Sequence, residues 1–334
     1  MVAGLIKRLN WAMADRLGFL FARKDSLYPW QAQPPARHVA DPATLPSGAE
    51  HYLRPDNPRL AELISRYRNV DPAVTAPLVW NEGKLAREDL LYFRGDNPYV
   101  WQSRGLGMSE LAYALTYYHV RVRHPDIVDR LDEDGAFGAH VHRFDGITVS
   151  RDLLDSAGEI DFLRRHARID RPGCALLDIG AGYGRLPHRL SQALPGLAIY
   201  ATDAFAPSTF LCEYYLAYRK AARTRVIPLD EVDTFLADTP IHVATNVHSF
   251  SECRPAAIEW WVSRLARHRV PYLMVVPNRV SPDSGHCLTN EDHDMEPLLE
   301  RHGYRCVVRE PRYKDPVVQA YGVDPSQLTL FTLA

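Results

Sequence analysis

The sequence has no excess of charge of either sign. Its 334 residues include 39 Lys or Arg and 41 Asp or Glu, giving a formal net charge of -2 and a pI of about 6.7. Proteins that bind nucleic acid usually carry a basic excess that neutralises phosphates. The balance therefore predicts no nucleic-acid partner.

Long apolar runs are also missing. Leu5, Leu9, Met13 and Leu17 recur at helical spacing, but charged side chains interrupt residues 5–20. A membrane-spanning helix needs about 20 predominantly apolar residues, and a signal peptide needs an apolar core. We therefore predict no transmembrane segment, no signal peptide and a cytoplasmic location. The pattern favours an amphipathic helix that packs on its own domain or on another subunit; weak association with a membrane surface is the alternative.

Cysteine is scarce and shows no pairing pattern. The five cysteines are widely spaced, and no Cys-X-X-Cys occurs. Disulfide frameworks and zinc sites have paired or clustered cysteines. We expect reduced thiols, as in a cytosolic protein, and no cysteine-based metal site.

Proline is abundant in one place, residues 26–58, which is typical of extended irregular chain. Helical periodicity then predicts helices at 57–67, 85–93 and 109–123. We assign residues 1–150 to a mainly helical N-terminal region that acts as a lid, contacts the substrate or forms a homo-oligomer interface. One apolar stripe on the third helix consists of Leu111, Leu115, Tyr118 and Val122.

Strands and helices alternate in the second half of the chain, residues 151–334. Strands are predicted at 175–178, 198–202, 225–228, 242–246, 271–276, 304–309 and 329–333, and helices at 186–194, 255–267 and 295–302. Such alternation indicates a parallel sheet with helices on both faces. The predicted fold class is α/β, with a Rossmann-like seven-stranded sheet.

A further helix is predicted to lead into this sheet. Ser156 and Glu159 have capping-box spacing, which places the helix at about 157–166. Arg151 and Asp152 precede that start, in a turn that either carries surface charge or lies over the ligand pocket.

The most informative stretch is the glycine motif after the first strand of this sheet. Gly180, Gly182 and Gly184 alternate, and Asp178 stands two residues before them. Dinucleotide enzymes use G-x-G-x-x-G, whose third glycine serves helix–strand packing beside a pyrophosphate. The tighter spacing favours S-adenosylmethionine (SAM), which has no pyrophosphate, with S-adenosylhomocysteine (SAH) as product. Asp178 is expected to organise donors around the methionine ammonium.

Two acidic residues support this interpretation. Asp203 ends the second strand, where a carboxylate can accept both ribose hydroxyls. Asp230 follows the third strand and is a candidate for the adenine amino group; a solvated helix start explains it equally well. An NAD-binding domain, or a methyltransferase-like domain without activity, is the alternative to the SAM site.

The fourth strand ends in a polar segment that we expect at the ligand crevice. It contains Asn246, expected at the cofactor, together with His248 and Glu252. His248 is the preferred general base for a hydroxyl, because its pKa lies near neutrality. Glu252 would orient His248 or act as the base itself. The non-catalytic alternatives are that His248 is a structural histidine and that Glu252 caps the following helix.

A second polar segment follows the fifth strand and includes His286 and Asp292. Carboxylates with an imidazole can hold Mg²⁺, which would acidify a sugar hydroxyl. The spacing is not a strong metal signature, so substrate hydrogen bonding or a solvated loop is preferred and no metal site is predicted.

Several motifs together resemble a bacterial family of sugar O-methyltransferases. They are residues 177–185, 202–204, 208–210, 246–252 and 276–278, with upstream matches at 101–104, 133–135 and 150–155. The resemblance covers the chain from about Tyr99 onward and implies a class I SAM-dependent fold, a saccharide hydroxyl as acceptor, and polysaccharide or glycosylated natural-product pathways.

The upstream residues suit a sugar on their own terms. Trp101, Arg104, Arg151 and Asp152 combine a flat aromatic ring with charged hydrogen-bonding groups, as saccharide sites do. Core packing explains Trp101 about as well. The predicted function is a SAM-dependent O-methyltransferase acting on a sugar. A non-sugar hydroxyl and a non-catalytic SAM- or nucleotide-binding subunit are the alternatives.

Overall fold

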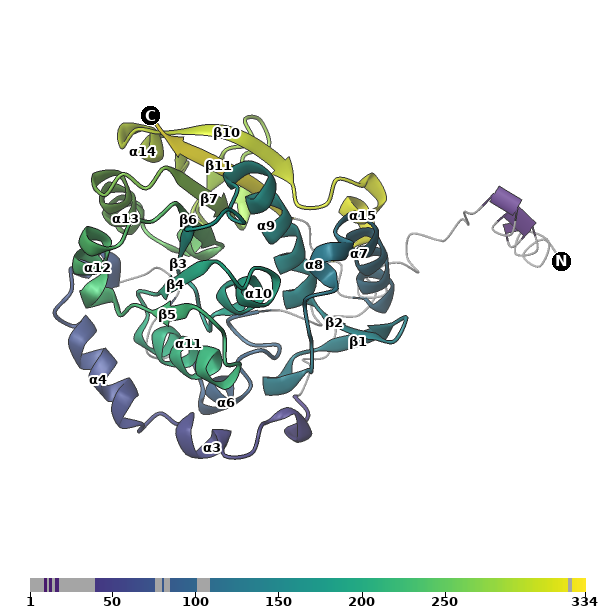
Figure 1. Cartoon of the computed structure of the whole chain (residues 1–334), viewed down its shortest axis with the longest axis horizontal. Helices are drawn as coiled ribbons and strands as arrows, with labels where there is room; N and C mark the ends of the chain where they lie inside the picture. Colours follow the sequence, from purple (N-terminus) through teal and green to yellow (C-terminus); the bar gives the residue numbers. More distant parts are fainter. Residues whose placement is uncertain are drawn as a thin grey trace.

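A seven-stranded sheet forms the centre of the molecule (Figure 1). The structure, a computed structural model, describes residues 9–10, 12–13, 16–17, 40–75, 80, 85–100, 109–323 and 326–334. In spatial order the strands are β10 (Tyr304–Pro311), β11 (Gln327–Leu333), β7 (Tyr272–Val276), β6 (Val243–Val247), β3 (Ala175–Ile179), β4 (Ala198–Thr202) and β5 (Thr224–Val226).

The chain order across this sheet confirms the predicted Rossmann-like α/β fold. Strands β3 to β7 run parallel, whereas β11 is antiparallel to both of its neighbours. From β3 the chain moves outward through β4 to β5, then returns to place β6 on the other side of β3. This reversal creates a switch point at the carboxyl ends of β3 and β6, where open α/β sheets bind ligands.

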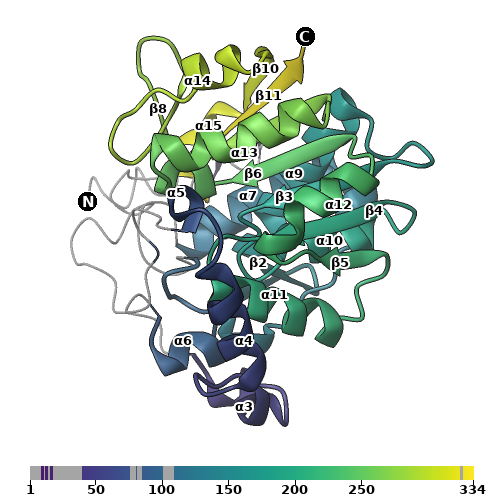
Figure 2. The ribbon, with the colours of Figure 1, turned by 90° about the vertical axis from the view of Figure 1, so that its left-hand side faces the viewer.

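Helices cover both faces of the sheet. They are α9 (Arg151–Ala167), α10 (Arg185–Ala193), α11 (Ala206–Tyr218), α12 (Val232–Asp238), α13 (Pro255–Arg267), α14 (Glu296–Arg301) and α15 (Pro316–Tyr321). Short pieces connect them: η4 (Leu229–Glu231), η5 (Ser249–Glu252), β8 (Arg279–Val280) and β9 (Cys287–Leu288). Figure 2 shows α11, α12 and α13 in front of the sheet and α9 and α10 behind it.

The two faces correspond to two hydrophobic clusters, because side chains alternate along a strand. Leu177 of β3 belongs to the cluster under α11, α12 and α13, whereas Leu176 belongs to the cluster under α9 and α10. Trp260 and Trp261 of α13 lie in the first cluster, as their apolar rings predict.

The N-terminal region packs into both clusters. It consists of η2 (Pro42–Thr44), α3 (Ala49–Tyr52), α4 (Pro58–Tyr67), α5 (Pro72–Thr75), α6 (Arg87–Leu91), α7 (Glu110–Arg123), α8 (Pro125–Val128), η3 (Ala136–Gly138) and the hairpin β1 (Val141–Phe144) and β2 (Ile147–Ser150). Leu63 of α4 and Phe93 join the first cluster, and Tyr117 of α7 joins the second. The division into 1–150 and 151–334 stays a prediction. Across the described residues, no helix is long and apolar enough to cross a membrane.

Helix α9 starts earlier than the sequence predicts. Ser150, not Ser156, is its N-cap and accepts a hydrogen bond from the backbone N–H of Leu153 at 3.3 Å. The Ser156 hydroxyl instead accepts a hydrogen bond from Arg185. Arg151 and Asp152 therefore lie in the first helical turn rather than before it, because the extended backbone of β2 ends at Ser150 and delivers a good capping side chain there.

The apolar stripe that marks the helix α7 in the sequence is not its buried face. Leu111, Tyr118 and Val122 are exposed. The buried face lies one to two positions along and contains Tyr113 and Tyr117. Both faces of α7 carry apolar residues at helical spacing. The sequence pattern alone therefore does not show that the face with Tyr113 and Tyr117 is the buried one.

Candidate active site

A cavity of about 820 Å³ opens at the carboxyl ends of the parallel strands. Its described wall comes from the turn after β3, the end of β4, the segments after β6 and β7, and the first turn of α9. Trp80 and Tyr99 of the N-terminal region complete one side. This is the switch point of the sheet, so the topology and the cavity indicate the same site.

The glycine turn follows β3 and brings backbone to the cavity wall. Gly180 has φ +70°, and a Cβ built on it would lie 2.3 Å from the Cβ of Ser249. No side chain fits there without moving the backbone after β6. Gly184, at φ +91°, is the N-cap of α10. The turn thus needs glycine for close approach and for left-handed backbone.

Asp203 joins the end of β4 to the glycine turn. Its carboxylate accepts hydrogen bonds from the backbone N–H of Gly182 at 2.9 Å and of Phe205 at 2.8 Å. Burial raises the pKa of Asp203 to about 7, against the lowering effect of these two hydrogen bonds. Each carboxylate oxygen keeps a further lone pair, so the group retains acceptor capacity at the cavity.

Asp178 lies on β3 and is buried beside the cavity. Thr245 of β6 donates its hydroxyl to one carboxylate oxygen at 2.6 Å. Burial raises the pKa of Asp178 to about 7, although the Thr245 hydrogen bond and the charge of Arg185 lower it. A carboxyl group held in this way carries less than a full negative charge near neutral pH.

Asn246 does not reach the cavity, which corrects its assignment as a cofactor ligand. Its amide donates to the carbonyl of Ile179 at 2.9 Å and accepts from the backbone N–H of Phe250 at 2.7 Å. The side chain is fully buried. Both ends of the amide are used inside the protein, so Asn246 ties the segment after β6 to the glycine turn.

His248 lines the cavity in an uncommon backbone conformation. Its φ is +67°, and its backbone N–H donates to the carbonyl of Val276 at 2.7 Å. The side-chain Nδ1 is buried without a hydrogen-bond partner among the described residues. Left-handed backbone at a residue with a Cβ costs free energy and is concentrated at functional sites.

The surroundings of His248 keep the imidazole neutral. Burial, with the guanidinium groups of Arg312 and Arg151, lowers the pKa of His248 to about 3. Asp155 is the nearby anion that raises it. Burial opposes the charged form of Asp155 too, but Arg312 and Arg151 outweigh burial and lower the pKa of Asp155 to about 2. The imidazole therefore faces the cavity as an uncharged group beside a permanent carboxylate.

The carboxylate of Asp155 is held by three groups. Arg312 approaches one oxygen at 2.7 Å, Tyr313 donates its hydroxyl to the same oxygen at 3.0 Å, and Arg151 contacts the other oxygen at 3.2 Å. Arg185 completes the cationic cluster and pairs with Glu159 of α9 at 2.8 Å. Arg151, Asp155 and Arg185 all line the cavity.

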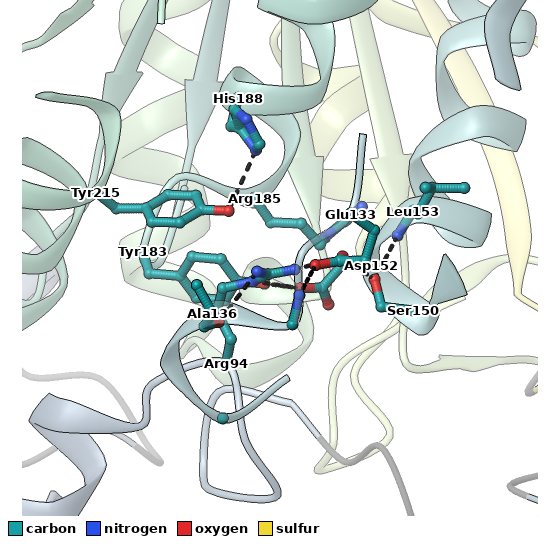
Figure 3. Close-up of polar contacts among 12 residues, drawn as sticks. Arg94, Glu133, Ala136, Ser150, Asp152, Leu153, Tyr183, Arg185, His188 and Tyr215 are labelled. Carbon is teal, nitrogen blue, oxygen red and sulfur yellow. Dashed lines mark hydrogen bonds and ion pairs between the residues drawn. The ribbon is translucent and has the colours of Figure 1, made fainter. Parts of the chain in front are cut away.

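A second buried network stands behind the first turn of α9 (Figure 3). Glu133 is its centre and pairs with Arg94 and Arg189, each at 2.6 Å. Arg94 also contacts Asp152 at 3.2 Å, and the hydroxyl of Tyr183 in the glycine turn donates to the same oxygen of Asp152. Asp152 and Tyr183 both line the cavity. The network therefore fixes one wall residue from the first turn of α9 and one from the glycine turn.

Aromatic side chains form the wall near Asp203. The rings of Trp80 and Tyr99 lie 4.8 Å apart, and the Tyr99 hydroxyl lies 3.1 Å from that of Ser208. The indole N–H of Trp80 donates to Glu252 at 2.5 Å. The charge of Glu252 raises the pKa of Asp203. Glu252 is therefore a cavity residue that contacts Trp80 and acts electrostatically on Asp203.

Three other sequence assignments fall outside the cavity and are corrected. Asp230 forms a bidentate ion pair with Arg66 of α4 at 2.8 and 2.9 Å. His286 pairs with Asp294 at 2.8 Å. Asp292 is exposed and contacts Arg279 at 2.9 Å. Asp230 is held at the surface by a partner from α4, whereas His286 and Asp292 are held there by partners from their own stretch between β7 and α14.

Trp101, Arg104 and most of residues 5–20 lie outside the described residues. Within the part of the chain that the structure describes, no three His, Cys, Asp or Glu side chains are arranged to hold a metal ion.

Sequence reasoning missed several wall residues. Tyr183 and Arg185 belong to the glycine motif, but only its glycines were selected. Trp80 and Tyr99 come from a region with no strand signal. Arg312, from the turn after β10, does not line the cavity but contacts the wall residue Asp155. Tyr183 could have been selected from the sequence, because it is an aromatic residue between two glycines of a ligand-binding turn. Trp80 and Tyr99 become neighbours of the site only through tertiary packing.

No protein-family model and no curated protein matches this sequence. Among solved structures, it is similar to magnesium protoporphyrin IX methyltransferase from Synechocystis PCC 6803 with bound SAM, at 14% identity and a TM-score of 0.37, over 66% of this chain and 96% of that chain. It is also similar to a SAM-dependent methyltransferase from Aquifex aeolicus, at 17% identity and a TM-score of 0.37, over 52% and 97%. The [4+2]-cyclase SpnF is similar at 13% identity and a TM-score of 0.39, over 65% and 93%. At these values the activity has to be argued from the chain's own residues.

Proposed function

We propose that this protein is a SAM-dependent O-methyltransferase that acts on a saccharide hydroxyl. The observation that carries the proposal is the position of Asp203. Its carboxylate closes onto the backbone N–H of Gly182 in the glycine turn while lining the cavity at the switch point. Asp203 follows β4, and the glycine turn that it contacts follows β3. A carboxylate in this position suits a ribose that lies across the ends of these two strands.

The residues present fit such a ligand. The cavity of about 820 Å³ lies within the range of small-molecule sites, about 300–1,000 Å³. Asp203 would hold the ribose hydroxyls, and the Gly180–Gly182 backbone would lie against the ribose and sulfur. Trp80 and Tyr99 offer ring surface for the adenine. When bound, SAM supplies an electrophilic methyl group, and SAH is the product.

His248 is the residue to which we assign the hydroxyl proton. Its pKa is lowered to about 3, which corrects the near-neutral value expected from the sequence. The imidazole is therefore neutral at physiological pH and can accept a hydrogen bond from the hydroxyl, but it is a weaker base than an ordinary histidine. The proton it takes up would face three arginines, and Asp155 is the carboxylate available to offset that charge. His248 thus acts as a neutral acceptor supported by Asp155.

The composition of the wall favours a saccharide acceptor. Apart from the two rings assigned to the adenine, the ring of Tyr183 shares the wall with polar groups such as Asn278 and Gln327. Sugars need flat apolar surface for their C–H faces and hydrogen-bonding groups for their hydroxyls. The family resemblance of the sequence supports the same acceptor class.

The donor is tested by calorimetry with SAH and with NAD. We expect SAH to bind and NAD not to bind; the reverse result removes the central claim. A screen of mono- and oligosaccharides, phenols and polyketides with labelled SAM, with and without EDTA, then tests the acceptor and any Mg²⁺ requirement. Labelling of only phenols or polyketides identifies a non-sugar hydroxyl, and tight SAH binding without any labelling identifies a binding subunit.

His248 is tested by replacement with alanine. For His248→Ala we expect SAH affinity within about threefold of wild type and turnover reduced by about 10²-fold or more, as for loss of a general base. His286→Ala is the matched control, because His286 lies outside the cavity and should leave turnover unchanged. Wild-type turnover in His248→Ala excludes His248 from the reaction.

A further inference from the structure

One carboxylate oxygen in the cavity wall lacks a partner. Asp152 is 1% exposed, and its Oδ1 is buried without a hydrogen bond; among the described residues it is the one carboxylate oxygen in that condition. The other oxygen, Oδ2, contacts Arg94 and accepts from Tyr183. Leaving a buried polar atom unsatisfied costs about 1–3 kcal/mol, more for a charged group. Such an atom at a cavity indicates a ligand that donates to it.

The neighbouring residue has the opposite charge. Arg151 precedes Asp152 in the first turn of α9, and both line the cavity. Arg151 is held in place by Asp155 at 3.2 Å, and Arg185 lies in the same wall. The N-terminus of a 17-residue helix adds positive potential to that of the arginines. An anion and a cation side by side suit a ligand group that contains both charges.

The first turn of α9 is joined to the glycine turn. Tyr183, which lies between Gly182 and Gly184, donates its hydroxyl to Asp152 (Figure 3). A ligand seated on the glycine turn therefore has Asp152 within the same part of the wall. Asp178, the residue first expected to serve the ammonium, is instead held by Thr245 and has its pKa raised to about 7.

We propose that Arg151 and Asp152 bind the zwitterionic amino-acid end of the methyl donor, with Asp152 Oδ1 accepting from the ammonium and Arg151 facing the carboxylate. This rests on the proposed function and deepens it, because it moves both residues from acceptor contacts to donor contacts. The acceptor must then be bound by other residues of the cavity wall. The same chemistry could come from an acceptor that bears an amino or carboxyl group, and the experiment distinguishes the two sources.

The test compares two ligands by calorimetry on the full chain. SAH has the amino-acid end, whereas 5′-methylthioadenosine has the same adenosine and sulfur without it. Asp152→Asn and Arg151→Gln should each weaken SAH binding about tenfold or more and change 5′-methylthioadenosine binding less than threefold. Arg151→Gln leaves the Arg94–Glu133 network intact, so it remains informative if Asp152→Asn is destabilised. Arg164→Gln, in the last turn of α9, pairs with Asp126 at the surface and should change neither affinity.

Three results would overturn the proposal. Equal losses for both ligands would mean that the substitutions disturb the whole site. Unchanged SAH affinity, with a raised KM for a charged saccharide acceptor, would place the zwitterion subsite in the acceptor. Wild-type protein that binds neither ligand would instead reject the proposed function itself, on which the subsite depends. Melting temperatures of all variants, measured alongside, identify loss of folding.

Discussion

At the scale of single residues, the site is unusual in how its charges are compensated. Asp178 and Asp203 are buried carboxyl groups whose pKa values are raised to about 7, whereas Asp155, equally enclosed, has its pKa lowered to about 2. The difference comes from neighbours. Asp155 contacts Arg312 and Arg151, while Asp178 and Asp203 receive hydrogen bonds from neutral groups. Burial alone therefore does not set the charge of a carboxyl group here.

The raised pKa of Asp178 predicts a pH dependence of stability. A raised carboxyl pKa means that the folded state holds a proton that the unfolded state releases. The contribution of Asp178 to the free energy of unfolding is therefore fully present below about pH 4 and is lost as pH rises through 7. The stability of wild type relative to Asp178→Asn should fall across that window, with ~4 kcal/mol as the upper limit. Urea unfolding of both proteins at pH 4.5, 6 and 8 measures it.

The comparison with the variant isolates this one group. His248 has a lowered pKa, so its own contribution has the opposite sign and is lost as pH falls, but it is present in both proteins. A difference in unfolding free energy that stays constant with pH would show that Asp178 is ionised in the folded protein throughout.

Gly180 gives a second prediction at this scale. Gly180→Ala places a Cβ 2.3 Å from Ser249 Cβ at a φ of +70°. We expect an unfolding free energy lower by at least ~2 kcal/mol and weakened SAH binding, from steric overlap together with strained backbone. Gly180→Ala combined with Ser249→Gly should recover the steric part only. Gly196→Ala is the control, since nothing lies within 4 Å of the position that its Cβ would take; equal losses at Gly180 and Gly196 would contradict the account.

At the scale of elements, helix ends decide where the site residues point. The start of α9 at Ser150 places Arg151 and Asp152 in a regular first turn whose dihedrals are fixed. Starting the helix near Ser156 would have left both residues in a loop. The correct boundary follows from the hairpin β1–β2, which ends at Ser150 and which the sequence pattern did not indicate.

The serine caps of α9 and α7 allow this to be measured. Ser150→Ala removes the cap of α9 and also the buried 2.5 Å hydrogen bond from Ser150 to Glu133. Ser109→Ala removes a comparable cap, that of α7. We expect the first to cost ~2–4 kcal/mol and the second ~1 kcal/mol in urea unfolding. Equal costs would show that the Glu133 hydrogen bond adds nothing.

At the scale of the whole molecule, the N-terminal region shares the hydrophobic clusters of the sheet. Helix α4 is further joined to α11 by the ion pair of Arg59 with Glu213 at 2.6 Å, and to η4 by Arg66 with Asp230. Trp80 and Tyr99 complete the cavity wall from the same region. The site therefore depends on both parts of the chain.

This packing predicts cooperative unfolding. In hydrogen exchange followed by mass spectrometry across a urea series, amides of α4 and α7 should lose protection at the same urea concentration as amides of β3 and β6. Their side chains lie in common clusters, so one part cannot open without exposing the other. Loss of protection in α4 and α7 at a clearly lower urea concentration would show two independently stable units.

The sequence by itself determined the sheet and its glycine turn, because strand periodicity, the spacing of Gly180 and Gly182 and the position of Asp203 are local properties of the chain. It also placed His248 at the cavity, since the end of a parallel strand faces the switch point. Only the tertiary structure decided the charge of that imidazole, which depends on burial first and then on arginines from α9, α10 and the turn after β10. It alone showed that Asn246 holds a turn and that one oxygen of Asp152 is buried without a hydrogen bond, because hydrogen-bond satisfaction is a property of neighbours in space.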